Sequence, residues 1–274
     1  MPSLAERTTL HVGGPALQWI VADDEGDLIE AVLTADDAGV PLLLLGGGSN
    51  MLVADAGFPG TVIEIATRGI GLGAQPGQIT VSAGEPWDRL VAYAVGQRWS
   101  GIEALSGIPG LAGATPIQNV GAYGQDVGQV VESVRVLDRS TGTIDVLGPE
   151  AISFGYRTSA FKRAPDRWVV LGLTLTLSPE PVGVVRYAEL ARELGIEVGD
   201  VADVEEIRAA VLTLRRRKSM VLDVADPDTR SAGSFFTNPV VSAQVAATVP
   251  AECPRYPSDA GIKLSAAWLI EQSG

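Results

Sequence analysis

Residues 17–50 read LQWIVADDEGDLIEAVLTADDAGVPLLLLGGGSN. The apolar runs at the two ends predict strands at Leu17–Val21 and Pro41–Leu45. Between them, apolar residues recur at helical spacing from Asp24 to Ala38, with an aspartate available to cap the start and a glycine directly after the end. The stretch therefore predicts a βαβ unit, and the glycine-rich loop Gly46–Asn50 directly follows its second strand.

The same signals predict the elements of the remaining chain. Strands are expected at Val62–Ile65, Ile79–Ala83, Val131–Leu137 and Trp168–Leu177, and helices at Pro86–Arg98, Asp203–Lys218 and Ala260–Gln272. The Ser-Pro-Glu-Pro stretch at residues 178–181 is typical of a linker. We therefore expect an α/β or α+β nucleotide-binding body up to about residue 180, followed by a second domain.

Composition excludes several classes of protein. The chain has 274 residues and a net charge of −13, which argues against nucleic-acid or membrane-surface binding. His11 and Cys253 are the only histidine and cysteine, so multi-histidine and zinc–cysteine metal sites and an internal disulfide are excluded. No metal is expected. Apolar runs too short for a bilayer and the lack of a signal-peptide pattern predict a cytoplasmic protein without membrane insertion.

The loop Gly46-Gly47-Gly48-Ser49-Asn50 leaves backbone N–H groups uncovered and permits positive φ angles. Such a loop suits the diphosphate of a nucleotide. It lacks the G-x-G-x-x-G spacing of the dinucleotide fingerprint, so an ordinary tight connection after a buried strand is an equal alternative.

A second glycine-rich run, SGIPGLAGATPIQNVGAYG, covers residues 106–124. It is long for an idle loop, and its side chains are small or carry amides, as at Thr115, Gln118 and Asn119. Small residues allow the backbone to approach a flat ring, and neutral amides can bond the polar edge of a flavin. A turn-rich linker is the alternative.

Five motifs then occur in order along nearly the whole chain. They are Leu45–Met51, Ser106–Gly124, SFGYRTS at residues 153–159, GSFFTNP at residues 233–239 and KLSAAWLI at residues 263–270. Together they resemble the UDP-N-acetylenolpyruvoylglucosamine reductases (UDP-N-acetylmuramate dehydrogenases) of bacterial peptidoglycan synthesis. The resemblance implies an α+β fold: a two-part FAD-binding domain of the vanillyl-alcohol-oxidase/PCMH type, residues 1–62 and 63–182, and a smaller α+β substrate-binding domain, residues 183–274.

The resemblance also implies the cofactor and its site. Members of the family use noncovalently bound FAD and NADPH to reduce an enolpyruvyl ether on a UDP-sugar. The expected FAD contacts are Gly46, Gly47, Gly48, Ser49, Asn50, Ile108, Pro109, Gly110, Thr115, Gln118, Asn119 and Gly121. No covalent link to His11 is expected.

For the chemistry, the resemblance assigns Arg157, with Tyr156 beside it, to the substrate carboxylate, and Ser234 to proton donation. Tyr187, Lys218, Asn238 and Lys263 are the expected substrate contacts. Without the motif, a surface salt bridge for Arg157 and a turn for Ser234 would be the simpler explanations. The run Arg215–Lys218 could equally be a helix end whose cations satisfy terminal carbonyls.

The family carries a further glutamate beyond the segment matching Trp268, and no residue of this sequence is assigned that role. We therefore expect the 274-residue chain to be an impaired catalyst, either as a fragment of an active enzyme or as a flavin and UDP-sugar binder. Another FAD oxidoreductase of the same fold and a noncatalytic binder stay as alternatives. We expect a monomer.

Overall fold

The computed structural model describes residues 2–231, 236–258 and 260–273. The chain forms two compact units, Met1–Ser231 and Ala232–Gly274. The domain boundaries expected at residues 62 and 182 both lie inside the first unit, and they stay predictions. Among the described residues, no helix combines the length and the apolar character that crossing a membrane requires.

Twelve strands and six α-helices are described in the first unit. The strands are β1 (Ala16–Ala22), β2 (Leu42–Leu45), β3 (Phe58–Ile65), β4 (Ile70–Leu72), β5 (Gln78–Ser82), β6 (Gly121–Ala122), β7 (Gln125–Asp126), β8 (Val131–Asp138), β9 (Thr143–Leu147), β10 (Trp168–Thr176), β11 (Val182–Val184) and β12 (Val201–Asp203). The helices are α1 (Glu25–Asp37), α2 (Trp87–Gly96), α3 (Pro149–Ile152), α4 (Ala160–Arg163), α5 (Ala188–Leu194) and α6 (Val204–Arg217).

The N-terminal strands form a parallel sheet in the order β1-β3-β2. The predicted strand, helix and second strand are confirmed, and Asp24 caps α1 by accepting a hydrogen bond from the Asp27 N–H at 2.8 Å. The sequence analysis did not predict that β3 inserts between the other two strands. The insertion places the glycine-rich loop after the edge strand β2.

A five-stranded antiparallel sheet, in the order β4-β5-β10-β8-β9, forms the centre of the first unit. Helix α2 packs against this sheet and contributes the fully buried Trp87, Leu90 and Val91. Helix α1 lies between the two sheets, because its Leu28 and Val32 belong to a core cluster with residues of β3, β8 and β10. Burial of each such side chain contributes about 1.5–3 kcal/mol.

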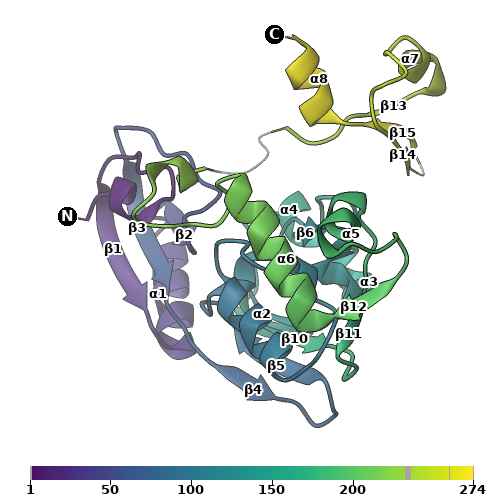
Figure 1. Cartoon of the computed structure of the whole chain (residues 1–274). Helices are drawn as coiled ribbons and strands as arrows, with labels where there is room; N and C mark the ends of the chain where they lie inside the picture. The colour runs from purple at the N-terminus through teal and green to yellow at the C-terminus, as the bar shows by residue number, and fades with distance from the viewer. Residues whose placement is uncertain (1, 232–235, 259, 274) are drawn as a thin grey trace. The chain divides into compact units, whose positions relative to one another are not determined.

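Helix α6 packs against two other helices of the first unit, α2 and α5. Figure 1 shows α6 crossing in front of α2, and the two helices contact each other. On another side, Ile207, Val211 and Leu214 of α6 pack with Leu190 of α5. The helix predicted from Asp203 is confirmed, with Asp203 as its N-cap residue.

The second unit contains the three-stranded sheet β13-β15-β14, formed by Val240–Val241, Gly261–Leu264 and Arg255–Ser258. Helices α7 (Ala243–Ala247) and α8 (Ala266–Ser273) complete it. The helix predicted from Ala260 was wrong in its first turn. Residues 261–264 instead pair with β13 and β14, and the helix begins only at Ala266.

Candidate functional site

The two glycine-rich runs meet in the first unit. A Cβ atom on Gly47 would lie 2.8 Å from the Cα of Gly110, and one on Gly46 would contact the Leu111 side chain at 3.6 Å. The Ser49 Oγ lies 3.5 Å from the carbonyl oxygen of Pro109. The two runs therefore pack backbone against backbone at this junction, where Gly47 is exposed and Gly110 is half-buried.

The glycine loop keeps its shape through contacts with the N-terminal segment. Gly48 has a φ of +62°, and a Cβ atom there would stand 2.0 Å from the Arg7 carbonyl oxygen. Its own carbonyl accepts a hydrogen bond from the Thr9 N–H at 3.1 Å. A side chain at position 48 would therefore break both the conformation and the contact.

The second run is fixed to the edge of the central sheet. The Ala112 N–H donates to the Glu85 carbonyl and the Gly113 N–H donates to the Ala83 carbonyl, both at 2.8 Å. The buried Thr115 donates its hydroxyl proton to the Ala112 carbonyl at 2.8 Å, which closes a single helical turn. This hydroxyl is therefore occupied within the run.

The amides expected at a flavin edge also hold neighbouring segments. Asn119 has a φ of +48° and donates from Nδ2 to the Gly155 carbonyl at 3.2 Å, and its Oδ1 accepts the Gly128 N–H at 2.9 Å. The Gln118 Oε1 accepts a hydrogen bond from Lys162 at 3.3 Å. Asn119 thus joins the glycine-rich run to the segment that carries Arg157.

Arg157 occupies the tightest part of that segment. Gly155 and Thr158 exchange backbone hydrogen bonds at 3.0 and 3.3 Å, and Arg157 between them has a φ of +53°, a conformation uncommon for residues with a side chain. Lys162 bonds its carbonyl at 3.0 Å. Within the described ranges, the half-buried guanidinium of Arg157 has no hydrogen bond or ion pair. Tyr156 beside it is 52% exposed.

Two of the expected substrate contacts, Tyr187 and Lys218, lie directly before α5 and directly after α6. Lys218 pairs with Glu189, with Nζ 2.7 Å from Oε1. Tyr187 precedes α5 and stacks edge-on against Tyr123 with ring centroids 5.5 Å apart. Burial raises the pKa of Tyr123, and the cations Lys218 and Arg215 act in the opposite direction. The structure therefore brings Lys218 and Tyr187 together around Tyr123.

Arg215 belongs to this group although no role was assigned to it individually. Its Nε is buried and has no hydrogen-bond partner in the part of the chain that the structure describes. Burial lowers the pKa of Arg215, while Tyr123 and Asp88 oppose that shift. Its place in a run of four cations was visible in the sequence, but its burial depends on the packing of α6.

The remaining predicted residues lie in or next to the second unit. Asn238 accepts the Ala266 N–H at 2.9 Å and thereby caps α8, and Lys263 lies 5.8 Å from the ring centroid of Tyr256. Ser234 lies outside the described residues. Their roles toward a substrate stay predictions.

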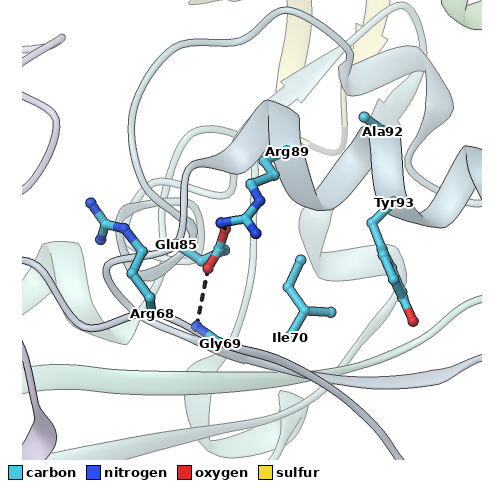
Figure 2. A pocket seen from close by; sticks show the side chains of 7 residues that line it. All are labelled: Arg68, Gly69, Ile70, Glu85, Arg89, Ala92 and Tyr93. Atoms are coloured by element: carbon cyan, nitrogen blue, oxygen red, sulfur yellow. Dashed lines mark hydrogen bonds and ion pairs between the residues drawn. The ribbon is translucent and has the colours of Figure 1, made fainter.

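A separate hollow of about 600 Å³ opens between β4 and α2 and was not expected from the sequence (Figure 2). The buried Glu85 at its base accepts the Gly69 N–H at 3.0 Å and pairs with Arg89 at 3.0 Å. Arg68 bonds backbone carbonyls of Thr67 and Gly84. The charged side chains that line this hollow are therefore paired with one another or bonded to the backbone.

Comparisons with known proteins define the class. Residues 16–148 match the model of an FAD binding domain. The chain is 50% identical to the UDP-N-acetylenolpyruvoylglucosamine reductase of Salinispora arenicola and 48% identical to that of Cutibacterium acnes. Each match covers 99% of this chain, and 77% and 73% of the relatives. The crystal structure of the Thermus caldophilus reductase superposes with a TM-score of 0.65 at 26% identity, over 100% of this chain and 79% of that one.

These matches establish an FAD-dependent oxidoreductase. The chain belongs to the UDP-N-acetylenolpyruvoylglucosamine reductase family. The mixed α+β fold, the FAD-binding domain, the cofactor and the enzyme class expected from the sequence are thereby confirmed. The junction of Gly46–Asn50 with Pro109–Leu111 is compatible with FAD, because the exposed Gly47 leaves the glycine loop accessible beside it.

Proposed function

We propose that this chain reduces the enolpyruvyl ether of a UDP-N-acetylglucosamine enolpyruvate to UDP-N-acetylmuramate in peptidoglycan synthesis, with NADPH as reductant. Family membership supports the reaction. The observation that carries the proposal is the Arg157 guanidinium, which has no partner among the described residues and lies in a turn that Asn119 bonds to the glycine-rich run. A UDP-sugar substrate and NADPH also favour a cytoplasmic enzyme.

When bound, FAD supplies the hydride-transfer chemistry between NADPH and the substrate. On this chain, Gly46, Gly47, Gly48, Ser49 and Asn50 would hold its diphosphate through backbone N–H groups. Ile108, Pro109, Gly110 and Gly121, with the amides of Gln118 and Asn119, would form the wall for its ring. The close approach of Gly47 to Gly110 supports this placement.

Arg157 would hold the carboxylate next to the reacting double bond. Hydride addition at the terminal carbon moves negative charge onto that carboxylate, so the charge-assisted hydrogen bonds from a guanidinium strengthen as the reaction proceeds. Arg157 therefore lowers the barrier and does not only bind the substrate. Tyr156, directly before Arg157 in the sequence, would contact the substrate next to Arg157.

Ser234 would donate the proton that the adjacent carbon requires, because hydride and proton together saturate the double bond. A Ser234→Ala variant should leave reduction by NADPH intact and slow the delivery of reducing equivalents to the substrate. Equal loss in both half-reactions would make Ser234 a structural residue.

The UDP portion would lie against Tyr187, Lys218 and the partly buried Arg215. An anionic diphosphate needs cations that a chain of net charge −13 otherwise offers sparingly. Asn238 and Lys263 are also proposed as substrate contacts.

Two anaerobic half-reactions test this function. The FAD-loaded chain should lose its visible flavin absorbance when NADPH is added, and addition of the enolpyruvyl UDP-sugar should restore it. UDP-N-acetylglucosamine without the enolpyruvyl group is the matched control and should restore nothing. Failure of NADPH to bleach the flavin, or equal recovery with the control sugar, would contradict the proposal.

The slow turnover and the monomeric state expected from the sequence stay predictions. Steady-state NADPH oxidation at ordinary enzyme rates, stimulated by the enolpyruvyl substrate, would contradict the first. Sedimentation of the purified chain measures the second.

A further inference from the structure

We propose that Asp88 and Arg208 are positioning residues that fix the start of the 106–124 run, and through it the wall expected to face the flavin. The inference rests on the proposed placement of FAD against this run. The two residues lie 120 positions apart in the sequence, on α2 and α6, and neither belongs to the motifs of the sequence analysis.

Two hydrogen bonds join these helices to each other, and two more bond them to the run. The Arg208 guanidinium donates to both carboxylate oxygens of Asp88, at 2.7 and 2.8 Å. The same Asp88 Oδ1 accepts the Gly107 N–H at 2.6 Å, and Arg208 Nη1 also donates to the Ser106 hydroxyl at 2.9 Å. The planar guanidinium therefore bridges the carboxylate and the hydroxyl in one fixed geometry.

The bonded groups of the run are buried or half-buried, whereas the Asp88 side chain is 40% exposed. Ser106 is fully buried and donates its own proton to the Glu103 carbonyl at 2.6 Å, so its oxygen is left to accept from Arg208. Gly107 has a φ of +70°, and a Cβ atom there would stand 2.9 Å from Leu212 of α6. Displacement of the pair would leave the half-buried Gly107 N–H without its acceptor.

The distance from this anchor to the proposed FAD site is short. Three residues beyond Gly107, Gly110 comes within contact of the glycine loop at Gly47 and Ser49. A shift of about 1 Å at the anchor is therefore transmitted directly to the junction of the two runs, where small misplacements are costly.

The chain offers a matched control pair on the same two helices. Arg98, directly after α2, pairs with Asp203, the N-cap residue of α6, through two bonds at 3.0 and 2.5 Å. Across the described residues, the side chains of Arg98 and Asp203 bond only to each other and to Glu205. This pair joins α2 to α6 as Asp88 and Arg208 do, but it does not contact the glycine-rich run.

The test compares Asp88→Asn, Asp88→Ala and Arg208→Gln with Asp203→Asn and Arg98→Gln. For each variant, thermal unfolding is measured without FAD. The FAD dissociation constant, the flavin absorbance spectrum and the flavin reduction potential are measured with it. We expect about a tenfold or greater loss of FAD affinity and a shifted spectrum at the Asp88 and Arg208 positions. Asp88→Asn, which keeps an acceptor for Gly107, should lose less than Asp88→Ala.

The control variants should keep FAD affinity within about twofold at a comparable loss of unfolding temperature. Equal loss of affinity in both pairs, or unchanged affinity and spectrum in the Asp88 and Arg208 variants, would overturn the inference. If Arg208→Gln does not fold, Arg208→Lys against Arg98→Lys gives the same comparison, because lysine keeps the charge but lacks the planar fork. Reduction of the wild-type flavin by NADPH reports separately on the proposed function.

Discussion

The backbones of Gly47 and Gly110 approach so closely that a Cβ atom on Gly47 would stand 2.8 Å from the Gly110 Cα. These residues lie 63 positions apart in the sequence, on two runs whose backbones pack against each other where they meet. Only hydrogen atoms fit between them, so the width of the junction depends on glycine at this position.

A Gly47→Ala substitution should therefore push the two runs apart and weaken FAD binding by about tenfold or more. Titration of the flavin-free chain with FAD, followed by flavin fluorescence, measures this. Gly96→Ala is the control, because a Cβ atom at Gly96, the last residue of α2, has nothing within 4 Å. Equal FAD affinity in Gly47→Ala and wild type would remove the junction from the cofactor site.

Arg157→Gln should leave reduction by NADPH nearly unchanged and slow reoxidation by the enolpyruvyl substrate by about a hundredfold or more, as expected when a group that stabilises developing charge is lost. Stopped-flow absorbance separates the two half-reactions. Arg163→Gln is the matched control, because Arg163 lies on the neighbouring helix α4 and its guanidinium, within the part of the chain described, hydrogen-bonds only to the Ser153 carbonyl at 3.5 Å. Similar slowing in both variants would assign Arg157 a structural role.

Two glutamates of α5, each in an ion pair, allow a specific role of Lys218 in UDP binding to be distinguished from a general effect of charge. Glu189 holds Lys218, and Glu193, one turn later, holds Arg217 at 2.7 Å. Glu189→Gln should free Lys218 and remove a nearby negative charge, so UDP should bind a few-fold more tightly, whereas Lys218→Gln should weaken it. Glu193→Gln should change UDP affinity little. Calorimetric titration with UDP measures all three, and identical effects of the two glutamate variants would contradict a specific role for Lys218.

The lowered pKa of Asp138 predicts that the folded state loses stability in acid. Hydrogen bonds from Arg167, with help from Ser140, lower the pKa of Asp138 from 3.8 to about 2. Because the folded state has the lower pKa, the stabilisation is complete above pH 3.8 and is lost as the pH falls through about 2. Asp138→Asn should therefore unfold at a lower temperature than wild type at neutral pH, and the difference should shrink toward pH 2. Thermal unfolding across this range measures it, and a difference independent of pH would contradict the assignment.

Local signals predicted the parts of the fold that local contacts determine. Helix α1 was predicted from the spacing of its apolar residues, from its Asp24 cap and from Gly39, which adopts a φ of +61° directly after it. The last helix was predicted to begin too early because the four residues Gly261–Leu264 are compatible with strand or helix until their partner strands are known.

Contacts between segments far apart in the sequence could not be predicted from local sequence signals. The position of β3 between β1 and β2 depends on packing of α1 against the second sheet, and the sequence contains no local mark of it. The motifs predicted the residues of the site, and their roles stay predictions. They did not indicate the Asp88–Arg208 pair or the burial of Arg215, because both depend on how α6 lies against α2.

The position of the flavin relative to Arg157 tests the central claim most directly. A crystal structure of the chain grown with FAD should place the diphosphate on the N–H groups of residues 46–50 and the ring against residues 108–121. The N5 edge should face the Arg157 guanidinium across a gap that the enolpyruvyl group can fill, with its double bond toward N5 and its carboxylate toward Arg157. A ring bound elsewhere, or an N5 edge turned away from Arg157, would contradict the account.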